Sequence, residues 1–163
     1  MEHAAPAIFV ALEQSGFAAA IRQSTWIYPL ANVGHIVALV CFAGAVAVMD
    51  LRLLGVFAAT APGVLIAQAR RFVIAAFCGL AATGFLLFSA EASHVAVNPV
   101  FQIKMALVVL GLLNAAVFEF AARRWLATLP AGAATPLSAR ALGFFSLGIW
   151  LAVAASGRAI AYF

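Results

Sequence analysis

The sequence predicts an all-α integral membrane protein, a four-helix bundle with an N-terminal amphipathic interfacial helix. Of its 163 residues, 67% are hydrophobic and only 9% are charged, against roughly 45–50% and about 25% in soluble domains. Four apolar stretches each approach the ~20 residues that a helix needs to cross about 30 Å of hydrocarbon. Helices fit such stretches because they satisfy their own backbone polar groups in lipid. The length fits a single membrane domain, residues 1–163.

Polar and aromatic residues mark where these segments meet the membrane surface. Residues 6–23 mix apolar and polar side chains too closely to span, so we expect a helix lying in the interface. The first span opens with Trp26 and Tyr28, which are typical interfacial aromatics, and closes near Asp50 and Arg52. The expected spans cover about residues 25–49, 72–90, 100–122 and 139–163.

The connections between the spans differ in character. Thr60–Ala61–Pro62 indicates the start of a short surface helix that ends at Arg70. Residues 91–99 form a short turn that closes at Asn98–Pro99, and residues 129–136 are a flexible connection. The first connection therefore carries structure of its own, whereas the other two only reverse the chain.

Basic residues predict the orientation. Arg22, Lys104 and Arg158 fall on one side, and six arginines flank the first and third connections: Arg52, Arg70, Arg71, Arg123, Arg124 and Arg140. Basic residues are enriched in cytoplasmic loops, so we expect both termini in the periplasm of a bacterial inner membrane. The net charge is +4, but no basic patch has the density that nucleic-acid binding needs.

Five polar residues form the candidate site, and the predicted topology directs all of them toward the periplasmic side: His35, Glu91, His94, Lys104 and Arg158. His35 is the deepest, roughly 13 Å below Trp26 at 1.5 Å per residue. Ionisable groups inside a membrane are costly, about 2.5–3.5 kcal/mol on insertion scales, and mark functional sites by default.

Each of the five has a structural alternative. Lys104 and Arg158 can extend to the interface on their long stems, and Glu91 and His94 can be solvated turn residues. His35 is too deep and too short to reach water, so its alternative is a neutral ring bonded to a neighbouring helix. A sixth polar residue, Glu119, we expect to pair with Arg123 at i+4.

The leading chemical hypothesis is haem b with His35 as an axial ligand, since imidazole commonly ligates haem iron and bundle cores commonly hold cofactors. The second axial ligand could be His94 or Lys104, or the iron could have no second protein ligand. Lys104 and Arg158 could instead pair with propionates. Three alternatives stay open: copper or other ion transport, proton or anion movement, and a non-catalytic accessory subunit with a membrane or periplasmic partner.

No established catalytic motif narrows the choice. The two cysteines, Cys41 and Cys78, lie in apolar runs and are interpreted as small buried hydrophobic residues. The sequence therefore leaves open whether the protein is an enzyme.

Four segments carry a resemblance to an uncharacterised family of small four-helix bacterial inner-membrane proteins: Trp26–His35, Asp50–Gly55, Phe88–Met105 and Gly157–Phe163. The family commonly has cysteine at the position of His94 and histidine at that of Glu119. The resemblance therefore leaves a matched polar set of His35, Glu91, Lys104 and Arg158. More distantly, the chain is similar to the membrane domain of copper-resistance D proteins and to HemJ-type protoporphyrinogen oxidase, which implies haem b.

Overall fold

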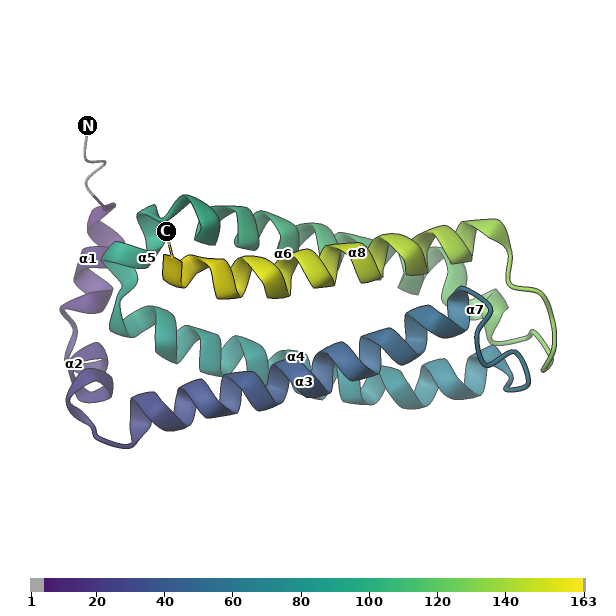
Figure 1. Ribbon diagram of the computed structural model, residues 1–163, viewed down its shortest axis with the longest axis horizontal. Coiled ribbons are helices and arrows are strands. Elements are labelled where there is room, and N and C mark those ends of the chain that lie inside the picture. Colours follow the sequence, from purple (N-terminus) through teal and green to yellow (C-terminus); the bar gives the residue numbers. More distant parts are fainter. Residues whose placement is uncertain (1–4, 163) are drawn as a thin grey trace.

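Four long helices dominate the computed structural model, which describes residues 5–162 (Figure 1). They are α3 (Ile27–Leu53), α4 (Pro62–Ala90), α6 (Pro99–Val117) and α8 (Leu137–Ala159). The third continues through the π-helix η1 (Phe118–Ala122) into α7 (Arg123–Leu126), and the fourth ends in the 3-10 turn η2 (Ile160–Tyr162). Three short helices complete the chain: α1 (Ala7–Glu13), α2 (Gly16–Gln23) and α5 (Ala92–Val97).

The four long helices are apolar enough to span a membrane. Large apolar side chains cover their outer surfaces, among them Leu30, Val40, Leu113 and Leu151, all of which are exposed. Such a surface suits hydrocarbon rather than water. The predicted all-α membrane bundle is therefore confirmed, and its environment is lipid.

The long helices form two pairs. Helix α3 packs along α4, α6 packs along α8, and the pairs meet chiefly through α3 and α8. Figure 1 shows the pairs as two layers, with α1, α2 and α5 across one end and α7 with its loop at the other. We call these the α5 end and the α7 end.

The end of α3 shows how local sequence stops a helix. Gly55 has φ +102°, a conformation that glycine adopts without steric cost. Its N–H donates to the Arg52 carbonyl at 3.2 Å, and the Val56 N–H donates to the Leu51 carbonyl at 2.9 Å. This is the Schellman arrangement, which satisfies carbonyls that the helix itself leaves unpaired.

Two connections differ from the sequence predictions. The short surface helix expected between Thr60 and Arg70 is not separate: α4 begins at Pro62 and runs unbroken to Ala90. Proline suits the first helical position because its missing N–H would be unpaired there in any case. The expected turn at 91–99 contains α5, and the Asn98 side chain then caps α6 by accepting from the N–H groups of Val100 and Phe101.

The N-terminal segment is also divided. The predicted interfacial helix over residues 6–23 consists of α1 and α2, and Ser15 separates them. The Ser15 hydroxyl accepts from the Ala18 N–H at 3.2 Å, an N-cap that starts a new helix. The predicted end of the fourth span at Phe163 lies outside the described residues.

Candidate functional site

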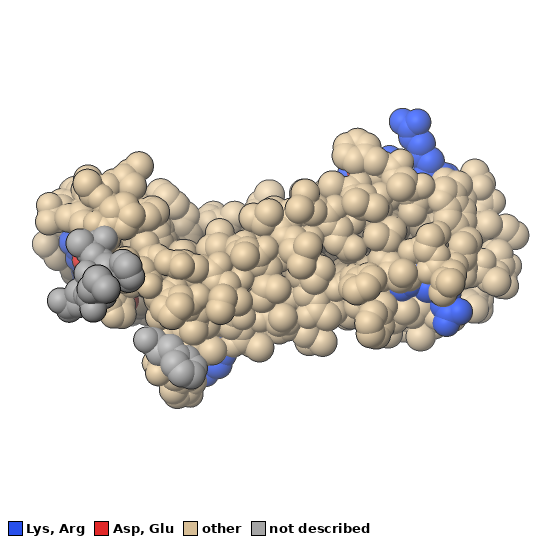
Figure 2. Space-filling view, turned by 90° about the horizontal axis from the view of Figure 1, so that it is seen from above, with Lys and Arg blue, Asp and Glu red and all other residues tan. Residues whose placement is uncertain are grey.

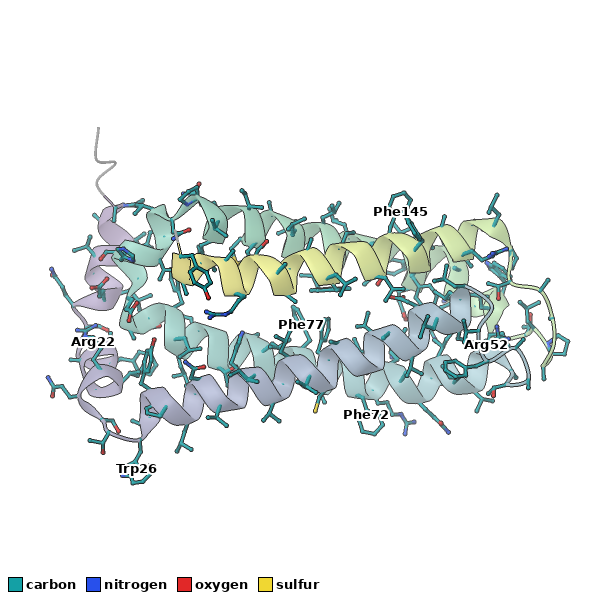
Figure 3. All side chains as sticks on the ribbon, viewed as in Figure 1. Arg22, Trp26, Arg52, Phe72, Phe77 and Phe145 are labelled. Atoms are coloured by element: carbon teal, nitrogen blue, oxygen red, sulfur yellow. The ribbon has the colours of Figure 1, made fainter. Side chains whose placement is uncertain are left out.

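An aromatic layer crosses the middle of the bundle. The Phe42 and Trp150 rings lie 4.6 Å apart between centroids and meet edge to face, and Phe77 lies 5.8 Å from Phe42. Figure 3 shows Phe77 directed between the two helix layers. Gly111 permits the contact with α6, because a Cβ there would lie 2.8 Å from the Trp150 ring. This layer joins all four long helices at the middle of the bundle.

A second layer lies two turns nearer the α5 end. Helices α3 and α6 run away from that end, and α4 and α8 run toward it. A step of seven residues toward the α5 end, about 10.5 Å, leads from the aromatic layer to one residue on each helix. These steps are Phe42 to His35, Phe77 to Gly84, Gly111 to Lys104 and Trp150 to Gly157. Two polar side chains thus share a level with two glycines. We call these four residues the His35 layer.

His35 is held in a defined orientation. Its Nδ1 lies 2.8 Å from the Thr83 hydroxyl, and that hydroxyl donates to the Gly79 carbonyl at 2.7 Å. With the Thr83 hydroxyl hydrogen placed on the Gly79 carbonyl, the Thr83 oxygen accepts from His35, and the ring proton is assigned to Nδ1. The lone pair is therefore on Nε2, the arrangement that outer-sphere hydrogen bonds impose on metal-binding histidines.

The glycines admit these side chains. A Cβ on Gly84 would lie 3.2 Å from His35 Cε1, so the ring rests against bare backbone. Likewise, a Cβ on Gly157 would lie 3.6 Å from Lys104 Nζ. Both polar side chains are partly buried, and the Lys104 ammonium lies within electrostatic range of the His35 ring. The structure thus brings together two of the five predicted site residues.

The other three predicted residues lie elsewhere. Glu91 is exposed one further step toward the α5 end, near Tyr28. His94 is exposed on α5. Arg158 donates to the Tyr162 hydroxyl at 2.6 Å, and its guanidinium lies 4.7 Å from that ring. None of the three joins the His35 layer through a hydrogen bond or ion pair among residues 5–162.

Hydrogen bonds that join α1 to α5 through Glu13 and Ser93, which we call the clip, were not predicted from the sequence. The Glu13 carboxylate of α1 accepts from both the N–H and the hydroxyl of Ser93. These two hydrogen bonds lower the pKa of Glu13. Arg22 adds a bridge by donating to the carbonyls of Glu13 and Ala90. The clip holds the N-terminal helices across the end of the bundle nearest His35.

Two buried polar side chains near the α7 end were also not predicted from the sequence. Asp50 and Arg52 were interpreted as interface markers, yet they are only 5% and 0% exposed. The Arg52 guanidinium donates to the Thr60 carbonyl and, at 3.4 Å, to the Thr135 hydroxyl. It thereby joins the two loops at that end. The sequence around Asp50 and Arg52 indicates that the helix ends nearby, before Gly55, but it does not indicate that these two side chains are buried.

The paired charge at Glu119 confirms a sequence prediction and extends it. Arg123 Nε lies 2.8 Å from a Glu119 carboxylate oxygen, as the i,i+4 spacing predicted. Arg70 of α4 contacts the same carboxylate at 3.2 Å. This second contact joins two helices that are far apart in the sequence.

The two cysteines differ from their interpretation as buried residues. Cys41 and Cys78 are exposed on the apolar surface of the bundle and are not bonded to each other. Within residues 5–162, no three histidine, cysteine, aspartate or glutamate side chains gather to hold a metal ion.

Comparison with known proteins gives a family. Residues 13–163 match a family described as a family of unknown function, DUF6644. The chain belongs to this family. No curated protein and no solved structure matches it. Membership confirms the family resemblance seen in the sequence, and the DUF6644 description brings no activity with it, so function has to be argued from the His35 layer.

Proposed function

We propose that this DUF6644 protein is a small b-type haem protein of the bacterial inner membrane, with an electron-transfer role. The observation that carries the proposal is the orientation of His35, whose Nδ1 proton is held by Thr83 so that Nε2 keeps its lone pair. Imidazole nitrogen in this form is the commonest protein ligand of haem iron.

The shortage of other ligands favours haem over a bare metal ion. Copper and zinc sites need about three or four protein ligands, and residues 5–162 contain no group of three. The porphyrin of haem supplies four nitrogen ligands to the iron, so the protein would need to supply only one or two more. A lone oriented histidine therefore fits haem better than it fits a bare copper or zinc ion.

The other residues of the His35 layer bear on the same proposal. Gly84 and Gly157 add no side chain to this level, and the His35 ring and the Lys104 ammonium lie in front of them, so haem would occupy the layer only if these two side chains moved toward it. The Lys104 ammonium suits a propionate carboxylate, or its amine suits the second axial position. Arg158 is bonded to Tyr162 and exposed, so a propionate role requires it to leave that partner. Haem, when bound, would supply one-electron chemistry.

Orientation completes the proposal. The arginines near the α7 end outnumber the basic residues near the α5 end, which supports a cytoplasmic α7 end and periplasmic termini. His35 then lies on the periplasmic side, where a periplasmic or membrane partner could exchange electrons with haem. Reporter fusions after Pro130 are expected to report the cytoplasm; a periplasmic signal would reverse this assignment.

The absorbance spectrum of the full chain tests the haem proposal. Protein expressed with added haem and purified in mild detergent is expected to show a Soret band. The His35→Ala variant should lose the band, whereas His94→Ala, which removes an exposed histidine, should keep it. Absence of the band after haem supplementation, or a band unchanged by His35→Ala, would overturn the proposal.

A further inference from the structure

One carboxylate holds two arginines together at the α7 end. Arg70 of α4 donates from Nε and Nη2 to the two Glu119 oxygens at 3.2 and 3.3 Å. Arg123 Nε lies 2.8 Å from the same group, as an ion pair whose geometry is not that of a hydrogen bond. Glu119 therefore fixes two guanidinium groups from different helices side by side.

The backbone is unusual at this point. Glu119 lies in the five-residue π-helix Phe118–Ala122, which interrupts the long α6–α7 helix. Such π-turns are uncommon and frequently occur at functional sites. Here the π-turn contains the carboxylate that reaches α4 while still pairing with Arg123. The π-turn is a feature of the backbone, independent of the ion pairs, that also marks the position of Glu119.

The two arginines keep unused donors. Glu119 engages Nε and Nη2 of Arg70, and the Nη groups of Arg123 have no hydrogen-bond acceptor among residues 5–162. The side chains of Arg70 and Arg123 are each 42% exposed. Two partly exposed guanidinium groups with free N–H groups match the oxygens of a phosphate.

Charge and apolar surface meet beside this pair. Arg71 and Arg124 follow directly in the chain and are exposed, so this part of the bundle carries four arginines and one glutamate. Phe120, next to Glu119 in η1, is 86% exposed. Phe72 is 70% exposed on a different face of α4 from Arg70, and Figure 3 shows it directed outward from that helix. Figure 2 shows Lys and Arg side chains projecting near this end, further charged atoms at the opposite end, and an uncharged surface between the two.

We propose that Arg70 and Arg123, held by Glu119, bind the phosphate of an anionic phospholipid. The arginines supply forked donors to the headgroup, and the exposed Phe120 beside Glu119 offers apolar surface to its acyl chains. Basic sites between membrane helices are suited to such headgroups. The apolar surface is what favours a lipid over free phosphate.

Lipid binding to the full chain in detergent, followed by native mass spectrometry, tests the proposal. The probes are phosphatidylglycerol and phosphatidylcholine with the same acyl chains. We expect phosphatidylglycerol to bind roughly tenfold more tightly. Both headgroups carry the phosphate, but the choline cation of phosphatidylcholine is repelled by the two arginines. Inorganic phosphate should not displace phosphatidylglycerol. Equal binding of the two lipids, or displacement by phosphate alone, would overturn the lipid assignment.

Variants separate this site from general positive charge. Arg70→Gln with Arg123→Gln should abolish the preference, whereas Arg140→Gln, at an exposed arginine of α8, should keep it. If the double variant does not fold, Arg70→Lys with Arg123→Lys retains the charges but removes the forked donors, and should lower the preference. An unchanged preference in the folded double variant, or in the lysine pair, would refute the site.

Glu119→Gln provides a further check. Removing this carboxylate makes the region more positive, so simple electrostatic attraction would strengthen lipid binding. A site that depends on the two arginines being fixed together should instead weaken. Stronger binding of phosphatidylglycerol by this variant would contradict the proposed role of Glu119.

Discussion

Replacing Gly143 by alanine is expected to loosen the contact between the two helix pairs. Gly143 of α8 lies against the end of α3, where an added Cβ would be 3.0 Å from Leu53 Cβ and 3.1 Å from the Asp50 carbonyl oxygen. Neither atom belongs to a flexible side-chain end. Helices α3 and α8 would therefore have to separate slightly along the contact that joins the pairs.

The magnitude follows from comparison with a second glycine on the same helix. A Cβ on Gly148 would meet nothing within 4 Å. Both alanine variants gain the same helix propensity, up to about 1 kcal/mol, so this contribution cancels between them. Overpacking remains for Gly143→Ala alone and costs about 1–3 kcal/mol. The free energy of unfolding should differ between the variants by that amount.

Unfolding of both variants in mixed micelles, followed by far-ultraviolet circular dichroism, measures this difference. Gly143→Ala should unfold at a lower denaturing-detergent fraction than the parent chain, and Gly148→Ala at the same or a higher one. If Gly143→Ala is at least as stable as Gly148→Ala, the close contact of α8 with the end of α3 is refuted.

Two further predictions concern the α5 end. Thr83→Val leaves the His35 N–H without its acceptor and should lower the free energy of unfolding by about 1–3 kcal/mol, whereas Thr83→Ser should not; equal stability of the two variants in the same assay would contradict the assigned ring proton. The pKa of Glu13 lies below its ordinary value of 4.5, so its clip stabilises α1 above that pH and weakens as the pH falls toward the lowered value. The protection factors of the α1 amides against hydrogen exchange, taken relative to the intrinsic rate at each pH, should therefore fall on acidification, and in Glu13→Gln they should be low at every pH. A fall in the protection factors that survives in Glu13→Gln would rule out the clip as its cause.

The candidate site was predictable in part. His35 and Lys104 stood out because ionisable groups in apolar stretches are costly to bury without a purpose. Thr83 carried no such signal, since a hydroxyl in an apolar helix commonly bonds its own backbone. From the sequence, Gly84 and Gly157 could be interpreted only as small residues that allow helices to pack closely. Only the antiparallel arrangement of the helices aligned these residues at one level.

The polar residues near the two ends were predicted less well. Arg52 resembled an interfacial charge, because a sequence does not show that two loops will fold over a helix end and supply acceptors. The division of the N-terminal helix at Ser15 was missed, although serine is a common N-cap. The apolar pattern on both sides of Ser15 is compatible with one continuous helix, and the contact of Glu13 with Ser93 joins segments 80 residues apart.

The sequence by itself determined that this DUF6644 protein is an all-α membrane protein with four long apolar helices. Lipid demands an apolar exterior and an internally bonded backbone, and both requirements are local properties of each helix. The tertiary structure alone decided which polar groups meet. The partners of His35 and Glu119 lie on other helices, and their positions follow from the packing of α3 on α4 and of α8 on α3. The Thr83 acceptor for His35 and the Arg70–Glu119–Arg123 cluster therefore depended on helix packing, which no single segment encodes.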